Sequence, residues 1–197
     1  MKTVIKPCST FVLVAGMSLL GRFDAQQTQN TTLQITLVRV QPDSPKPSFR
    51  VVLHNIGEYP LILNLGMMLA NGKQQYADAV TLVLTDNQGN TTPLELLDPA
   101  IVGGRIDPLI LPLPKGSTFI LPINLADYIS PKNNSWKVTL IPGKYRISAA
   151  YAGVGVSQRR ANPDMQGISL MPYWTGAVRS NAVTFTVSKT VDFPHGK

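Results

Sequence analysis

Residues 140–151, Leu-Ile-Pro-Gly-Lys-Tyr-Arg-Ile-Ser-Ala-Ala-Tyr, decide the fold class of this chain. Pro142 and Gly143 fit the two central positions of a type II turn, because proline presets the first φ and glycine accepts a positive second φ. Beyond the turn, Tyr145, Ile147, Ala149 and Tyr151 share one face, and Lys144, Arg146 and Ser148 share the other. This period of two predicts a β-strand with one buried and one solvent-facing side.

The same alternation recurs along the chain. It marks Leu33–Val40, Phe49–Leu53, Leu61–Leu65, Val80–Leu84, Phe119–Leu125 and Val183–Val187. Sixteen prolines, spread with few gaps, oppose long helices, and no helical period runs past two turns after residue 25. We therefore expect an all-β fold, a two-sheet antiparallel sandwich of about 7–9 strands.

The connections between these segments carry turn residues. Asp86–Asn90 predicts a tight hairpin, since Asx and Gly residues favour that turn. Gly66–Asp78 is expected to be a loop or a short irregular excursion. Ala152–Gly176 is the longest irregular piece. No repeat or linker divides the chain, so we expect one domain over residues 26–190, followed by a flexible C-terminal tail at 191–197.

Residues 1–25 have the pattern of a secretory signal peptide. Lys2 and Lys6 precede the apolar stretch Phe11–Leu20, and a small residue, Ala25, follows. We expect cleavage near Ala25 and export to the periplasm or the extracellular space; an uncleaved signal anchor is the alternative. The chain's one cysteine, Cys8, lies in this leader, so the mature chain would have no disulfide and no catalytic thiol.

Charge is distributed unevenly. Without its leader the chain keeps a net charge of +5, with −2 in residues 26–100 and +7 in residues 101–197. In an exported protein this bias suits a protein partner or an anionic envelope polymer, although a soluble basic surface needs neither. Nucleic acid is not expected as a partner, because basic residues are not interleaved with aromatic ones. No transmembrane segment is expected after signal cleavage.

The order of turn residues resembles a known group of domains. Asn55-x-Gly57-x-x-Pro60, Leu113-Pro114-x-Gly116 and Pro142-Gly143-x-Tyr145 follow the order seen in bacterial extracytoplasmic immunoglobulin-like domains. The pattern resembles the BsuPI-type proteinase-inhibitor domain in particular and, more loosely, fibronectin type III. The resemblance implies an immunoglobulin-like sandwich, a structural corner at Pro142, Gly143 and Tyr145 whose phenol reaches upstream backbone, and one candidate activity, proteinase inhibition. It carries no inhibitory residue onto this chain.

The sequence predicts no catalytic, cofactor-binding or metal site. The mature chain has only two histidines, His54 on the solvent side of a strand and His195 in the tail, and it has no Gly-x-Ser-x-Gly elbow. Asp86–Asn90 faintly resembles a calcium loop, but position twelve is Leu97 where the motif needs Glu. A carboxylate pair among the ten mature acidic residues remains an open alternative, since spacing does not show which of them meet.

One segment has the composition of a binding surface. Between Ala152 and Gly176 lie Arg159, Arg160, Met165, Met171, Tyr173 and Trp174. These residue types are enriched at interface centres, and loops on a rigid sandwich commonly carry recognition. The alternative is that Tyr173 and Trp174 fold back and cap the end of the sandwich. We therefore expect a non-enzymatic binding or structural module, with a proteinase inhibitor second and a carboxylate-based enzyme third.

Overall fold

The computed structural model describes residues 32–42, 44, 46–69, 74–97, 106–130, 137–155, 167 and 170–193. Within them most residues lie in β-strands, and Leu125–Asp127 forms a short 3₁₀ turn, η1. The strands are β1 (Leu33–Val40), β2 (Ser48–Asn55), β3 (Leu61–Leu69), β4 (Gln74–Tyr76), β5 (Val80–Thr85), β6 (Thr91–Leu96), β7 (Ile106–Leu113), β8 (Thr118–Ile123), β9 (Tyr128–Ile129), β10 (Val138–Leu140), β11 (Gly143–Gly153), β12 (Gly176–Arg179), β13 (Val183–Val187) and β14 (Val191–Phe193). The all-β prediction is confirmed.

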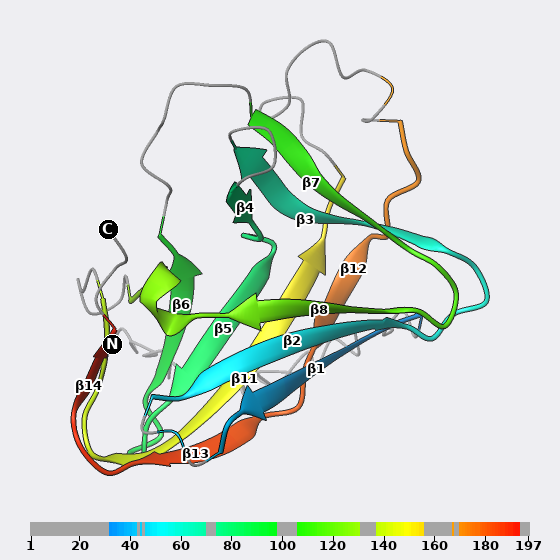
Figure 1. Cartoon of the computed structure of the whole chain (residues 1–197). Coiled ribbons are helices and arrows are strands. Elements are labelled where there is room, and N and C mark those ends of the chain that lie inside the picture. Colours follow the sequence, from blue (N-terminus) through cyan, green and yellow to red (C-terminus); the bar gives the residue numbers. More distant parts are fainter. Residues whose placement is uncertain are drawn as a thin grey trace, which may run out of the picture.

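All strand pairs are antiparallel. One ladder has the order β1-β2-β8, a second has the order β4-β3-β7, and a third runs β12-β11-β5-β6-β9 with β13 also on β11. A short ladder joins β10 to β14. Figure 1 shows β1, β2 and β8 crossing in front of β5 and β11, so the ladders form the two layers of a sandwich. No helix in the described part of the chain is long and apolar enough to cross a membrane.

The expected number of strands is too low, because short strands (β4, β9, β12 and β14) lie in segments that the alternation does not mark. The described residues hold fourteen strands, four of which have only two or three residues. Two long ribbons, each interrupted by a bend, contain eight of these strands. In the first, the β2–β8 pair continues into the β3–β7 pair beyond residues 56–60. In the second, the β11–β13 pair continues into the β10–β14 pair.

This second ribbon corrects two expectations. Leu140 pairs with Val191 and Gly143 pairs with Val187, so the chain bends at Pro142 without reversing direction. Gly143 has no positive φ, and the predicted type II turn is therefore wrong. The tail prediction is wrong for residues 191–193, since Val191 and Phe193 are buried in β14. Residues 194–197 lie outside the described residues, as do residues 1–25.

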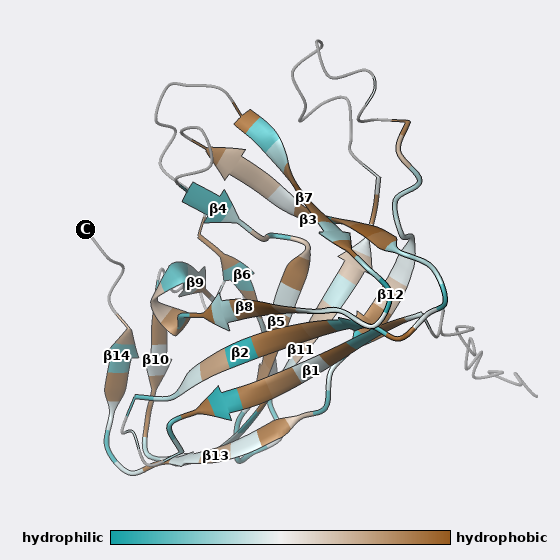
Figure 2. Cartoon of the chain, turned by 45° about the vertical axis from the view of Figure 1, so that its right-hand side comes forward, coloured by the Kyte–Doolittle hydropathy of each residue, from teal (hydrophilic) through white to brown (hydrophobic). Residues whose placement is uncertain are grey.

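The core lies between the layers, and aromatic rings join them. Along β11 the buried positions are Tyr145, Ile147, Ala149 and Tyr151, as the alternation predicts. The ring of Phe49 on β2 meets Phe185 on β13 edge to face, with centroids 5.5 Å apart. Tyr145 stacks on the same Phe185 ring at 5.6 Å. Figure 2 shows the corresponding alternation of hydropathy along β1 and β2.

The Tyr145 hydroxyl makes the upstream backbone contact that the corner implies. It donates a hydrogen bond to the Ile141 carbonyl oxygen at 3.0 Å. Burial of the ring raises the pKa of the Tyr145 phenol. The bond spans the Pro142 bend and fixes the direction in which β11 leaves it.

The side chain of Asn181 connects the layer that contains β1 to the layer that contains β11 and β13 by hydrogen bonds. Asn181, between β12 and β13, accepts a hydrogen bond from the Leu37 N–H at 2.9 Å and donates one to the Leu37 carbonyl at 3.1 Å. An amide side chain thus occupies the place of a neighbouring strand beside β1. Such pairing satisfies backbone groups that an unpaired strand edge leaves open.

Asn55 organises the bend of the first ribbon. Its side chain is fully buried, and Nδ2 donates to the carbonyl oxygens of Tyr59 and Leu113, both at 2.9 Å. Its Oδ1 accepts from the Gly57 N–H at 3.0 Å. The backbone of Asn55 also pairs with Gly116 and Ser117 across the bend. The amide therefore satisfies polar groups on both chains of the ribbon where the regular ladder is interrupted.

Asn55→Ala should lower the free energy of unfolding by about 2–4 kcal/mol, because it removes the amide donor from the carbonyls of Tyr59 and Leu113 at a fully buried site. Asn124→Ala is the matched control: Asn124 is exposed and its side chain makes one hydrogen bond, to the Ala126 N–H. That variant should cost about 0.5–1 kcal/mol. Urea unfolding of both proteins measures the difference. Equal losses would contradict the role given to Asn55.

Candidate functional site

The structure separates the residues of the expected contact loop. Arg159, Arg160 and Met165 lie outside the described residues. Of the rest, Met171 is exposed, Tyr173 is half-buried and Trp174 is buried. Their neighbour Leu170, which the composition argument did not single out, is 84 % exposed.

Trp174 is a structural residue, and its expected role as a contact residue is wrong. Its indole Nε1–H donates to the Thr32 hydroxyl at 3.0 Å, and its backbone N–H donates to the Ile62 carbonyl at 2.9 Å. The ring stacks on Tyr151 with centroids 5.6 Å apart. The alternative of a cap on the sandwich therefore holds for Trp174, because indole is the largest apolar side chain available and its N–H finds an acceptor inside the fold.

Two glycines that pair across β11 and β12 make room for this ring. A Cβ on Gly153 would lie 2.4 Å from Cε3 of Trp174 and 2.5 Å from its carbonyl oxygen. Gly176 has φ of +149° and would place a Cβ 3.1 Å from the ring. The irregular segment thus leaves and rejoins the sheet at glycines, because no other residue fits beside Trp174.

The described residues of the irregular segment Ala152–Gly176 also present apolar side chains to solvent. We call Val154, Leu170, Met171 and Tyr173 the loop-end patch; Val154 is 57 % exposed. Tyr173 lies against Gly155, next to Val154, and its hydroxyl is 3.8 Å from the Met171 sulfur. The patch is therefore built from both ends of the segment and stands beside the buried Trp174.

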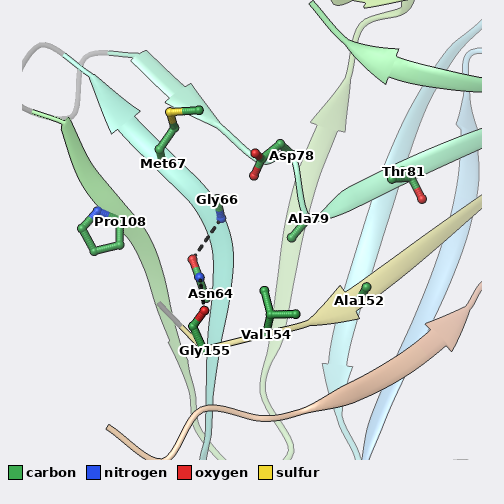
Figure 3. Close-up of a pocket in the computed structure, with 10 residues that line it drawn as sticks. All are labelled: Asn64, Gly66, Met67, Asp78, Ala79, Thr81, Pro108, Ala152, Val154 and Gly155. Carbon is green, nitrogen blue, oxygen red and sulfur yellow. Dashed lines mark hydrogen bonds between the residues drawn. The ribbon is translucent and has the colours of Figure 1, made fainter. Parts of the chain in front are cut away.

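A cavity of about 430 Å³ opens next to the patch (Figure 3). We call it the Asn64 cavity. Its lining residues come from β3, the β4–β5 turn, β5, β7 and the end of β11: Asn64, Gly66, Met67, Asp78, Ala79, Thr81, Pro108, Ala152, Val154 and Gly155. Val154 belongs to both the cavity and the patch. The volume falls within the range of small-ligand sites in proteins.

A β-bulge in β3 shapes this cavity. The register with β7 shifts between Asn64 and Gly66, and the Asn64 side-chain oxygen accepts the Gly66 N–H at 3.2 Å. Gly66 has φ of +139°, and a Cβ there would overlap the Tyr76 carbonyl oxygen at 2.1 Å. The Tyr151 hydroxyl holds the bulge from inside by donating to the Asn64 carbonyl at 3.1 Å. Burial raises the pKa of this phenol, which stays protonated as a donor.

The described residues include some of the titratable side chains that the sequence analysis considers. They contain no group of three or more His, Cys, Asp or Glu side chains placed to hold a metal ion. His54 is half-buried on β2, and His195 lies outside the described residues. Asp86 is a turn residue: the Asn90 side chain donates to its carboxylate and lowers the pKa of that carboxyl. Within the cavity the polar side chains are Asn64, Asp78 and Thr81.

Comparison with known proteins yields no family model that matches this chain and no curated protein that matches its sequence. The site therefore has to be understood from its own residues. Sequence reasoning missed Asn64 and treated Gly66–Asp78 as a loop, although β3 runs to Leu69. An asparagine and a glycine two residues apart inside an apolar strand pattern were the available signal, since such residues mark bulges.

Gly153→Ala should lower the free energy of unfolding by about 1–3 kcal/mol, because its Cβ would meet the backbone of Trp174 and force the segment to move. Gly155→Ala is the matched control, since its Cβ would have ordinary contact with Tyr173 at 3.9 Å. We expect that variant to change stability by less than about 0.5 kcal/mol. Denaturant midpoints report both; a neutral Gly153→Ala would contradict the packing of Trp174.

Proposed function

We propose that this chain is an exported, non-enzymatic module that binds a protein partner through the loop-end patch. The observation that carries the proposal is the exposed Val154 at the mouth of an open cavity, on a segment that also exposes Leu170 and is anchored at Trp174. Scattered apolar residues are ordinary on a protein surface, whereas apolar residues gathered at the mouth of a cavity are typical of interaction sites.

Preorganisation supports this surface as a binding site. Trp174 and Tyr173 hold the described part of the segment by backbone bonds to Ile62 and Met171. A segment that is already ordered loses less conformational entropy on binding. Because the patch is apolar, it favours a protein partner over an anionic envelope polymer.

An immunoglobulin-like architecture is part of the proposal. The Tyr145 hydroxyl supports it by donating a hydrogen bond to the Ile141 carbonyl near the start of β11. Domains of this architecture commonly recognise partners with loops at one end of the sandwich, and the loop-end patch lies at one end of β11.

Proteinase inhibition ranks second, and the geometry of the exposed turn between β2 and β3 weighs against it. Tyr59, between β2 and β3, is 79 % exposed and would be the natural side chain to enter a proteinase pocket. Its carbonyl oxygen, however, points inward and accepts from Asn55 Nδ2. A substrate-like inhibitor has to present that carbonyl to the oxyanion hole of the proteinase.

A photo-crosslinking amino acid at Leu170 should yield one discrete adduct in cells that export the protein, because the side chain would face the partner. The same residue at Ile141 is the control, since Ile141 is 63 % exposed at the opposite end of β11. Mass spectrometry of the adducts measures the difference. Identical adduct patterns at the two positions would contradict the proposed surface.

A further inference from the structure

The Asn64 side chain has binding capacity that the fold does not use. It is only 9 % exposed, and Figure 3 shows it at the centre of the cavity lining. Its oxygen is engaged by the Gly66 N–H, while Nδ2 has one long contact, 3.5 Å to the Gly155 carbonyl. An amide nitrogen carries two protons, so among the described residues the second proton has no acceptor. A buried donor of this kind usually has a partner, and here the cavity is where that partner would lie.

The residues that line the Asn64 cavity restrict the kinds of ligand that can bind there. No Lys or Arg occurs among the described lining residues, and Asp78 adds negative charge, so phosphate and carboxylate ligands are disfavoured. No aromatic ring occurs among the lining residues that the structure describes, so they offer no stacking surface for a sugar or a base. The apolar walls are Met67, Ala79, Pro108, Ala152 and Val154. What remains is an uncharged or cationic ligand that joins apolar carbon to a hydrogen-bond acceptor.

A polypeptide segment carries both parts in one residue. An apolar side chain of leucine size fits the walls, and its peptide carbonyl is the acceptor that Asn64 Nδ2 lacks. Thr81, exposed on β5, adds a hydroxyl at the rim that can pair with a second peptide group. The neighbouring loop-end patch would contact the residues on either side of the inserted one.

We propose that the Asn64 cavity receives one apolar residue of an extended polypeptide segment, whose backbone carbonyl accepts a hydrogen bond from Asn64 Nδ2. This inference rests on the proposed function in that the segment belongs to the protein partner. It can nevertheless be tested with a small peptide that is too short to cover Leu170 and Met171.

The experiment titrates the purified, isotope-labelled protein with N-acetyl-leucine-N-methylamide and follows the Asn64 side-chain NH₂ and Val154 methyl signals by NMR. N-acetylglucosamine, which has the acetamide but no apolar side chain, and N-acetyl-glutamate-N-methylamide are the comparison ligands. We expect saturable shifts with the leucine probe at millimolar concentration and at least tenfold weaker binding of the other two. Asn64→Asp keeps the acceptor for Gly66 and removes the donor, so it should weaken the leucine probe about tenfold.

Two further variants separate the outcomes. Ala152→Trp fills the cavity from an exposed position and should abolish the shifts. Val154→Lys should weaken the shifts, and it replaces Ala152→Trp as the cavity variant if that protein does not fold. Ile141→Asp should leave them unchanged, because Ile141 is exposed at the opposite end of β11 and belongs to neither the cavity nor the loop-end patch. Absence of saturable shifts, equal binding of the sugar, or shifts that persist in both cavity variants would overturn the inference. Failure of the crosslink at Leu170 would instead contradict the proposed function.

Discussion

The indole of Trp174 is the contact on which the functional end of this sandwich depends. The indole N–H donates to Thr32 just before β1, and the ring stacks on Tyr151 near the end of β11. The backbone N–H of Trp174 donates to the Ile62 carbonyl in β3. Glycines 153 and 176 leave space for the ring on both sides. Because one buried ring bridges both layers, the segment it terminates is held in place, and the exposed side chains just before it gain a fixed position beside the cavity.

Asparagine side chains form hydrogen bonds with the backbone where the strands are interrupted. Asn55 satisfies both chains at the bend of the first ribbon, Asn181 stands in for a strand beside β1, and Asn64 stabilises the bulge in β3. An amide carries a donor and an acceptor, so it can replace either half of a ladder hydrogen bond. Asn55 uses both of its Nδ2 protons within the fold, whereas Asn181 is exposed, so its second Nδ2 proton faces solvent. Asn64 keeps one donor directed at a cavity, which is why it marks a binding site and the other two do not.

The periodic signal in the sequence was sufficient for the fold class and for the inward face of β11. It failed wherever a long-range contact overrides local preference. Pro142-Gly143 has the composition of a reversing turn, but pairing of Gly143 with Val187 keeps the chain extended. Val191–Phe193 looks like a frayed end until β10 supplies its partner. Tryptophan is a residue type enriched at interfaces, and only the contacts of Trp174 with Thr32 and Tyr151 show that it is a core residue. The cavity depends on a bulge and four separate elements, which no single stretch encodes.

Hydrogen exchange of the Trp174 indole N–H tests the central claim most directly. The chain has two tryptophans, so Trp136→Phe assigns the signal. If Trp174 anchors the segment to both layers, its indole proton should exchange only through global unfolding, with a free energy of exchange equal to the free energy of unfolding in urea. Exchange at the rate of a solvent-exposed indole in the folded protein would contradict the account, because the segment would then open independently of the sandwich.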